Sequence, residues 1–246
     1  MWYYIIVIVP IVYFLMMSAT DQYPPLLYIE QKLDKPTASF IFLHGLGKTG
    51  EWQKQQFFDL MRENTRFPHI KMIFPTSRYV HCSHKNSKTY SWFDFKAAPD
   101  HSRDTFQVFP ETLNETFEYI DKLVKTEIES GISPDRIIIG GVSQGAVVSL
   151  LYGYARDTNI KGVISLSGFY PKIYEDKFRT DDNLPPLFFA NFDGDRIIPY
   201  YTIKGSAEFL STKPIVMESH LYHADSHEIN KEMLTDTYKW IEKNLK

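Results

Sequence analysis

The sequence predicts an α/β fold in which a mainly parallel sheet carries helices on both faces. Short, nearly unbroken apolar segments alternate along the chain with longer segments whose apolar residues recur at helical spacing. Unbroken apolar segments are typical of strands that are buried on both faces, as parallel strands are. With 246 residues the chain is long enough for one such domain with a sizeable core.

The expected elements are bounded by glycine, proline or polar turn residues. We expect strands over residues 25–33, 38–45, 70–75, 135–141, 161–168, 186–192 and 213–222. We expect helices over residues 51–62, 144–157, 203–210 and 228–245, and a long amphipathic one that Pro110 opens and Gly131 ends. Two stretches, 76–105 and 168–186, look irregular and leave little room for a large cap domain.

Composition and charge are those of an ordinary globular protein. Hydrophobic residues make up 43% and charged residues 23%, a balance that does not favour wholesale disorder. The formal net charge is -3 and the Lys and Arg residues are scattered, so we expect no nucleic-acid partner. Cys82 is the only cysteine, so the domain has no internal disulfide.

The first 20 residues differ from the rest of the chain. Residues 2–17 are all apolar or aromatic, small residues follow, and Asp21 is the first charge. We expect residues 1–20 to be a signal peptide or a signal anchor and residues 21–246 to be the single domain. This predicts a protein of the secretory pathway, either secreted or associated with a membrane through the apolar segment. A cytoplasmic protein is the alternative.

Ser143 is the strongest candidate for a catalytic residue. It lies in Gly141-Val142-Ser143-Gln144-Gly145, between an expected strand and an expected helix. A sharp turn there crowds the backbone, and glycine on both sides of the serine relieves the crowding. The turn would present the hydroxyl at the N-terminus of the helix, where backbone N–H groups favour negative charge. We therefore expect a nucleophile rather than an incidental serine in a turn.

A serine nucleophile needs a base, and the base needs an orienting acid. Asp193 and Asp195 follow the expected strand at 186–192, and His223 and His227 precede the last expected helix. Acid and base therefore follow the serine in the chain order that hydrolases with this kind of turn use. Taken singly, the acids could serve only to form a turn and the histidines could be ordinary surface residues.

A glycine-rich loop over residues 43–50 is the last expected part of the site. It directly follows an apolar strand, so one of its backbone N–H groups can point toward the serine. Together with the N–H of Gln144 it would form an oxyanion hole. His44, like Ser143 and Asp195, lies just after the end of an expected strand, where parallel sheets bind ligands.

These motifs together resemble the acyl-protein thioesterase, lysophospholipase and carboxylesterase family, which has the α/β-hydrolase fold. The similarity covers residues 38–244 and rests on "LHGLG", "SWFD", "SGISPDRIIIGGVSQGA", "GVISLSG", "DGDRIIP" and "YHADSH". The resemblance implies Ser143 as nucleophile, His227 as general base and Asp195 as orienting acid. Members of the family cleave thioesters or oxyesters of fatty acyl groups. We therefore expect an acylated protein, a lysophospholipid or another ester as substrate, and no cofactor.

The resemblance also implies the remaining site residues. The N–H groups of Leu46 and Gln144 would form the oxyanion hole, and Trp92 would line the acyl site. His44 and Lys48 complete the residues that we expect to bind substrate. Lys48 stands where the family usually has an acidic residue, and a cation there could attract an anionic headgroup.

Other functions stay open at this point. A general short-chain carboxylesterase would use the same residues, and a hydrolase-like fold can also serve as a binding module, although such proteins generally lack a catalytic residue. The histidines at 220, 223 and 227 could be interpreted as metal ligands. We expect no metal there, since no cysteine or glutamate completes a set of four.

Overall fold

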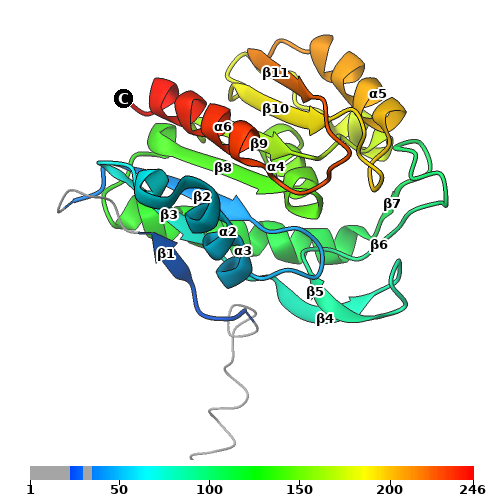
Figure 1. Cartoon of the computed structure of the whole chain (residues 1–246), viewed down its shortest axis with the longest axis horizontal. Coiled ribbons are helices and arrows are strands. Elements are labelled where there is room, and N and C mark those ends of the chain that lie inside the picture. The colour runs from blue at the N-terminus through cyan, green and yellow to red at the C-terminus, as the bar shows by residue number, and fades with distance from the viewer. Residues whose placement is uncertain (1–22, 30–34) are drawn as a thin grey trace, which may run out of the picture.

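A sheet of seven strands runs through the computed structural model, which describes residues 23–29 and 35–246 (Figure 1). In spatial order the strands are β1 Leu27–Ile29, β3 Ile70–Phe74, β2 Ala38–Leu43, β8 Ile137–Val142, β9 Gly162–Leu166, β10 Leu187–Phe192 and β11 Met217–Tyr222. Neighbouring strands are parallel except for β1 and β3. The expected mainly parallel sheet is confirmed, with β1 as an antiparallel edge strand.

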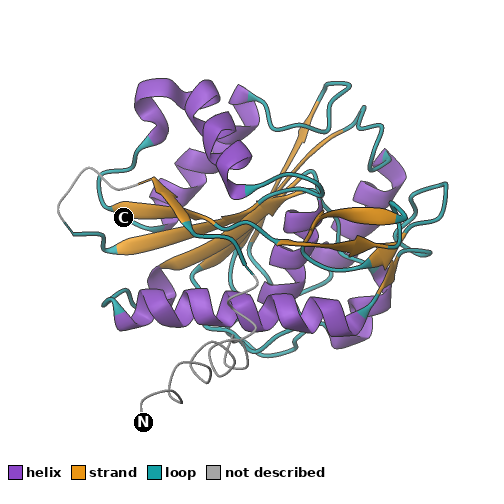
Figure 2. Cartoon of the chain, turned by 90° about the horizontal axis from the view of Figure 1, so that it is seen from below, coloured by secondary structure: helices purple, strands orange, loops and turns teal. Residues whose placement is uncertain are grey.

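Helices cover both faces of this sheet, as Figure 2 shows. They are α2 Gly50–Met61, α3 Pro110–Glu129, α4 Gln144–Tyr154, α5 Tyr200–Ser211 and α6 Lys231–Asn244, with short 3-10 helices η2 Arg62–Thr65, η3 Pro134–Arg136 and η4 Lys172–Lys177. The apolar residues of α2 and α6 belong to the core on one face, and those of α3, α4 and α5 belong to the core on the other. The expected two-sided cover is therefore confirmed.

The unbroken apolar strands fit between these two cores because successive side chains point to opposite faces. In β8, Ile138 packs on the α2 and α6 side, whereas Ile137 and Ile139 pack on the other side. A polar residue at any of these positions would be buried in one core or the other. The apolar pattern of the central strands thus follows directly from their position in the sheet.

The stretch 76–105, which looked irregular in the sequence, contains two-stranded pairs. β4 Arg78–Cys82 pairs with β5 Ser87–Ser91, and β6 Phe95–Lys96 pairs with β7 Gln107–Val108. These strands are short, and β4 and β5 carry mostly polar or half-exposed side chains, so no apolar period marks them. Both pairs contribute residues to the candidate site below.

The expected leader, residues 1–20, lies outside the described residues, and its role stays a prediction. Across residues 23–29 and 35–246, no helix is long and apolar enough to cross a membrane.

Candidate active site

Ser143 lies at the turn between β8 and α4. Its backbone has φ 55° and ψ -118°, a strained conformation for a residue with a side chain. A Cβ on Gly141 would lie 2.4 Å from the carbonyl carbon of Gly145, and a Cβ on Gly145 would lie 2.2 Å from the Leu43 carbonyl oxygen. The close approach that we expected from the two glycines is therefore present. The Ser143 N–H donates to the Leu166 carbonyl oxygen (2.9 Å), which fixes the turn against β9.

His227, which lines the same pocket as Ser143, forms a hydrogen-bonded pair with the buried Asp195 behind it. His227 Nδ1 lies 2.7 Å from Asp195 Oδ2, and the aspartate side chain is 0% exposed. Asp195 Oδ1 accepts the N–H groups of Ile197 (2.7 Å) and Ile198 (2.9 Å). Because an ionised carboxylate only accepts hydrogen bonds, Nδ1 carries the imidazole proton and Nε2 of neutral His227 is free to act as a base.

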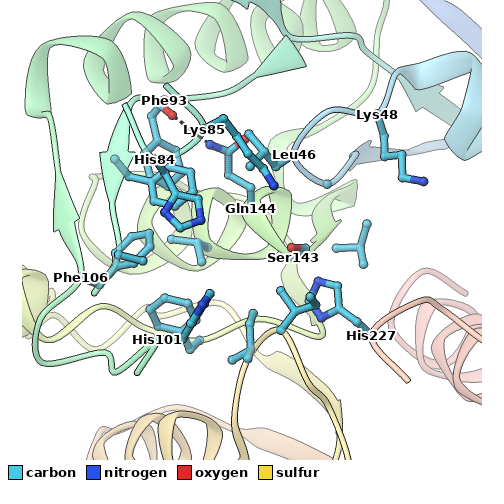
Figure 3. A pocket seen from close by; sticks show the side chains of 18 of the residues that line it. Leu46, Lys48, His84, Lys85, Phe93, His101, Phe106, Ser143, Gln144 and His227 are labelled. Carbon is cyan, nitrogen blue, oxygen red and sulfur yellow. Dashed lines mark hydrogen bonds between the residues drawn. The ribbon is translucent and has the colours of Figure 1, made fainter. Parts of the chain in front are cut away.

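The Ser143 hydroxyl and the His227 ring lie next to each other in the lining of the pocket (Figure 3). In the described part of the chain no hydrogen bond joins the two side chains. Such contacts are often long in proteins without a bound substrate and shorten when one is present. The arrangement therefore suits transfer of the serine proton to the imidazole.

A second aspartate–histidine pair lies outside the pocket. His223 Nδ1 is 2.5 Å from Asp193 Oδ2, but the His223 side chain is 86% exposed and does not line the pocket that contains Ser143. Of the two acids and two histidines that the sequence offered, the structure brings His227 and its buried partner to the serine.

The loop between β2 and α2 lies beside Ser143 and places Leu46 in the pocket wall. Gly47 N–H donates to the Tyr90 carbonyl oxygen (2.8 Å), which holds the loop against β5. Within residues 23–29 and 35–246, no protein acceptor takes the Leu46 N–H. The N–H of Gln144 is the first of α4, where N–H groups lack partners within the helix. Both donors expected for an oxyanion hole are thus free to bind an anion.

The Gln144 side chain connects the serine turn to the segment that follows β5. Its Nε2 donates to Ser91 Oγ (2.8 Å) and to the Phe93 carbonyl oxygen (2.9 Å), and its Oε1 accepts the N–H of Trp92 (3.0 Å). These bonds fix the first residue of α4 in place. This role was not predictable from the sequence, because contacts between segments more than 50 residues apart leave no local pattern.

His44 and Trp92, which we expected to bind substrate, lie behind the pocket wall instead. Both are almost fully buried, and neither lines the pocket. The Trp92 indole N–H donates to the His44 carbonyl oxygen (2.8 Å), and His44 Nε2 accepts the Ser77 N–H (2.9 Å). Burial lowers the pKa of His44 to about 4. The side chains of both residues are buried in the core rather than exposed to the cavity. Through these hydrogen bonds they position the loop that carries Leu46.

The cavity beside Ser143 has a volume of about 340 Å³ and one strongly aromatic side. Phe93, Phe95, Phe106 and Phe169 form this side, which we call the aromatic wall. Their ring centroids are 5.0 to 6.4 Å apart from one neighbour to the next. The aromatic wall was not predicted from the sequence, because its residues lie in short strands and loops. The high density of phenylalanine between residues 93 and 106 was the one pattern that could have indicated it.

Lys48 lines the pocket, as expected, but its charge is matched by a neighbour. Its Nζ lies 3.7 Å from Glu228 Oε1 and 3.8 Å above the centre of the Trp52 ring. An anionic substrate group would have to compete with Glu228 for this lysine.

The three histidines that could be interpreted as metal ligands, His220, His223 and His227, each have a carboxylate partner. His220 Nε2 lies 3.1 Å from Glu218 Oε1, and His223 and His227 contact their aspartates. In the part of the chain that the structure describes, no three His, Cys, Asp or Glu residues are grouped so as to hold a metal ion.

The chain is similar to known esterases and thioesterases. The family model for phospholipase/carboxylesterase matches residues 25–245. Acyl-protein thioesterase 1 of Yarrowia lipolytica is 32% identical over 216 residues, covering 85% of this chain and 93% of the relative. Lysophospholipase-like protein 1 of Mus musculus is 29% identical over 210 residues, covering 83% and 86%. The crystal structure of Zea mays acyl-protein thioesterase 2 superposes with a TM-score of 0.75 at 20% identity, covering 91% of this chain and 100% of that one, a likeness of fold.

Proposed function

The chain belongs to the phospholipase/carboxylesterase family and is a hydrolase of esters or thioesters, and we propose that Ser143, His227 and Asp195 are its catalytic triad. The observation that carries the assignment is that His227 lines the pocket that contains Ser143 and is held from behind by the buried Asp195. A buried carboxylate that holds an imidazole in one tautomer beside a strained, accessible serine is the arrangement that acyl transfer requires.

In the reaction, Ser143 Oγ attacks the substrate carbonyl carbon while His227 Nε2 takes the hydroxyl proton. The carbonyl oxygen becomes negatively charged and is stabilised by the N–H groups of Leu46 and Gln144. Losing one such donor typically raises the barrier by about 3 to 4 kcal/mol. His227 then returns the proton to the leaving thiol or alcohol. Water, activated by the same imidazole, hydrolyses the acyl-enzyme and restores the serine.

The substrate class that the pocket favours is a fatty-acyl thioester or oxyester. Relatives carry the names acyl-protein thioesterase and lysophospholipase-like protein. The aromatic wall next to Ser143 offers an apolar surface for an acyl chain, since burial of methylene groups is favourable by about 0.8 kcal/mol each. An acylated protein or a single-chain lipid would fit these features.

A fluorophosphonate probe tests the proposed nucleophile. We expect the probe to label the wild-type protein and not Ser143→Ala, and we expect p-nitrophenyl ester hydrolysis to disappear in the same variant. Labelling of Ser143→Ala at another residue, or no labelling of the wild type, would overturn the assignment. Hydrolysis of acetyl and butyryl esters without activity on longer acyl chains or on a palmitoylated peptide would favour a general short-chain carboxylesterase.

A further inference from the structure

We propose that the pocket selects esters that carry a negatively charged group, and that Lys85 is the specificity-determining residue that binds this group. The inference rests on the proposed function, because it assigns a substrate class to the same pocket. The observations that support it are the charged residues around the cavity.

Lys85 lies in the turn between β4 and β5, and it lines the pocket. Figure 3 shows its side chain extending over the cavity, with the ammonium group on the side of Gln144 and Ser143. Among the described residues, no carboxylate lies within ion-pair distance of Lys85, and Glu228 is the only acidic residue that lines the pocket.

Lys48, the other lysine of the pocket lining, already has a counter-charge. It lies on the other side of the serine in Figure 3, and its Nζ is 3.7 Å from Glu228 Oε1. The positive charge of Lys85 therefore faces the cavity without a counter-charge from the described part of the protein. A substrate with an anionic group near the scissile bond would supply that counter-charge.

Two histidines complete this side of the cavity. His84 stacks on Phe95 with ring centroids 4.9 Å apart, and the His101 ring lies 6.0 Å from that of His84. Both line the pocket. Burial and the nearby charges of Lys85 and His101 lower the pKa of His84, so at neutral pH this ring is an uncharged hydrogen-bond donor and acceptor. Lys85 then carries the charge, and an imidazole N–H can share the anion's oxygen atoms.

The chemistry of this rim suits a carboxylate or a phosphate, and such a group can come from either part of the substrate. It can terminate a short acyl group derived from a dicarboxylic acid, with the methylene groups against the aromatic wall. It can instead belong to the leaving group, as the phosphate of a single-chain phospholipid does. Both sources place an oxyanion near the Lys85 ammonium group.

Two matched substrate pairs separate these sources. One pair is mono-p-nitrophenyl adipate and its methyl ester, which differ by a charge on the acyl group. The other is lysophosphatidate and monoacylglycerol with the same acyl chain, which differ by the phosphate on the leaving group. We would measure kcat/KM at low and high salt for wild type, Lys85→Gln and Lys85→Glu. Lys88→Gln is the control, because Lys88 is an exposed lysine of the same hairpin that does not line the pocket.

We expect the wild type to prefer the charged member of at least one pair at low salt. Lys85→Gln should lower kcat/KM for that charged substrate by about two- to fivefold, the upper part of the range for one exposed ion pair, and Lys85→Glu should lower it further. The neutral partner and the Lys88→Gln variant should be unaffected, and high salt should reduce the difference. The pair that responds identifies the part of the substrate that bears the charge.

The inference is wrong if Lys85→Gln changes charged and neutral substrates equally, if it changes neither, or if Lys88→Gln has the same effect. In each of these outcomes the wild-type protein still hydrolyses the esters, so they are distinct from failure of the proposed function. If wild-type protein hydrolyses no member of either pair, the inference fails, whereas the proposed function is decided separately by fluorophosphonate labelling of Ser143 and by hydrolysis of the palmitoylated peptide.

Discussion

The carboxylate of Asp195 lies 2.7 Å from His227 Nδ1 and has no exposure to solvent, whereas the imidazole itself reaches the pocket. Two backbone N–H groups on the other carboxylate oxygen hold the aspartate in a single orientation. The position of the charge is therefore fixed before substrate binds. In the proposed mechanism, an imidazolium formed at His227 would be stabilised by a charge that water does not screen.

Replacement of Asp195 by asparagine tests the tautomer that this pair imposes. An asparagine amide that donates to Nδ1 would leave the proton on Nε2, where it blocks proton transfer from Ser143. We expect kcat to fall by about 10⁴-fold at neutral pH. The urea unfolding midpoint should change little. The measurement is steady-state hydrolysis of a p-nitrophenyl ester together with urea unfolding.

Asp193→Asn is the matched control for this change. Asp193 forms the same kind of contact with His223, but that histidine is 86% exposed and lies outside the pocket. We expect its kcat to stay within about twofold of wild type, since exposed ion pairs contribute little. A large loss of activity in Asp193→Asn, with normal activity in Asp195→Asn, would show that Asp193 is the orienting acid and that the assignment to Asp195 is wrong.

The turn at Ser143 depends on the absence of a side chain at position 145. A Cβ on Gly145 would lie 2.2 Å from the Leu43 carbonyl oxygen, which belongs to a buried strand and has no room to move. We expect Gly145→Ala to lower the free energy of unfolding by at least about 2 kcal/mol, because overpacking at a rigid site is costly. Urea unfolding monitored by tryptophan fluorescence measures the change.

Gly205→Ala serves as the comparison for this prediction. Gly205 lies inside helix α5, where an added Cβ meets the Arg103 side chain at an ordinary 3.4 Å. Alanine favours the helix by up to about 1 kcal/mol over glycine, so stability should be kept or increased. Equal stability of the two variants would show that the turn tolerates a side chain.

The strands of the sheet and the serine turn were predictable because their signals are local. An apolar strand such as β8 must be buried on both faces, and glycines flanking Ser143 have one good explanation in a sharp turn. The choice of His227 over His223 followed from the resemblance to the family, and burial of Asp195 now gives it a physical basis.

The pocket wall was much less predictable. Phe95 reaches the cavity from the two-residue strand β6, Phe106 from the loop residue before β7, and Lys85 from a hairpin turn, and none of these segments has an apolar period. Trp92 was expected in the pocket wall but lies behind it. This buried aromatic residue of a family motif instead supports the loop that carries Leu46. Which side of a loop faces a cavity depends on contacts between distant segments, and these leave no pattern along the chain.

The acyl-chain range of the pocket can be narrowed at Ala97, a half-buried residue of its lining. A phenylalanine there would occupy part of the space beside the aromatic wall. We expect Ala97→Phe to lower kcat/KM for palmitoyl and lauroyl esters at least about tenfold, while acetyl ester hydrolysis stays near the wild-type value. Ala98→Phe, next to it but outside the pocket lining, should leave the chain-length profile unchanged. A profile shifted equally by both variants would indicate a general distortion of the segment.

Stability at acid pH should depend on His44. Burial lowers its pKa to about 4 in the folded protein, below the ordinary value of 6.5. Between these pH values the unfolded chain binds a proton that the folded protein does not, so the unfolded state is favoured as pH falls. The contribution of neutral His44 to the free energy of unfolding should therefore be complete above pH 6.5. The protein should lose about 3 kcal/mol of this free energy as pH falls to 4. Nε2 accepts the Ser77 N–H, so protonation there would also break a buried hydrogen bond.

His44→Gln removes this titration and keeps a side chain able to form hydrogen bonds. Its free energy of unfolding at pH 7 will fall, so the informative quantity is the slope with pH rather than the absolute value. We expect urea unfolding between pH 6.5 and pH 4 to show a smaller loss of stability in the variant than in wild type. Carboxylates that titrate in the same range are common to both proteins and cancel in the difference. Equal slopes would mean that His44 accepts a proton in the folded protein as readily as in the unfolded chain, and that the loop beside Ser143 is less tightly packed than its burial indicates.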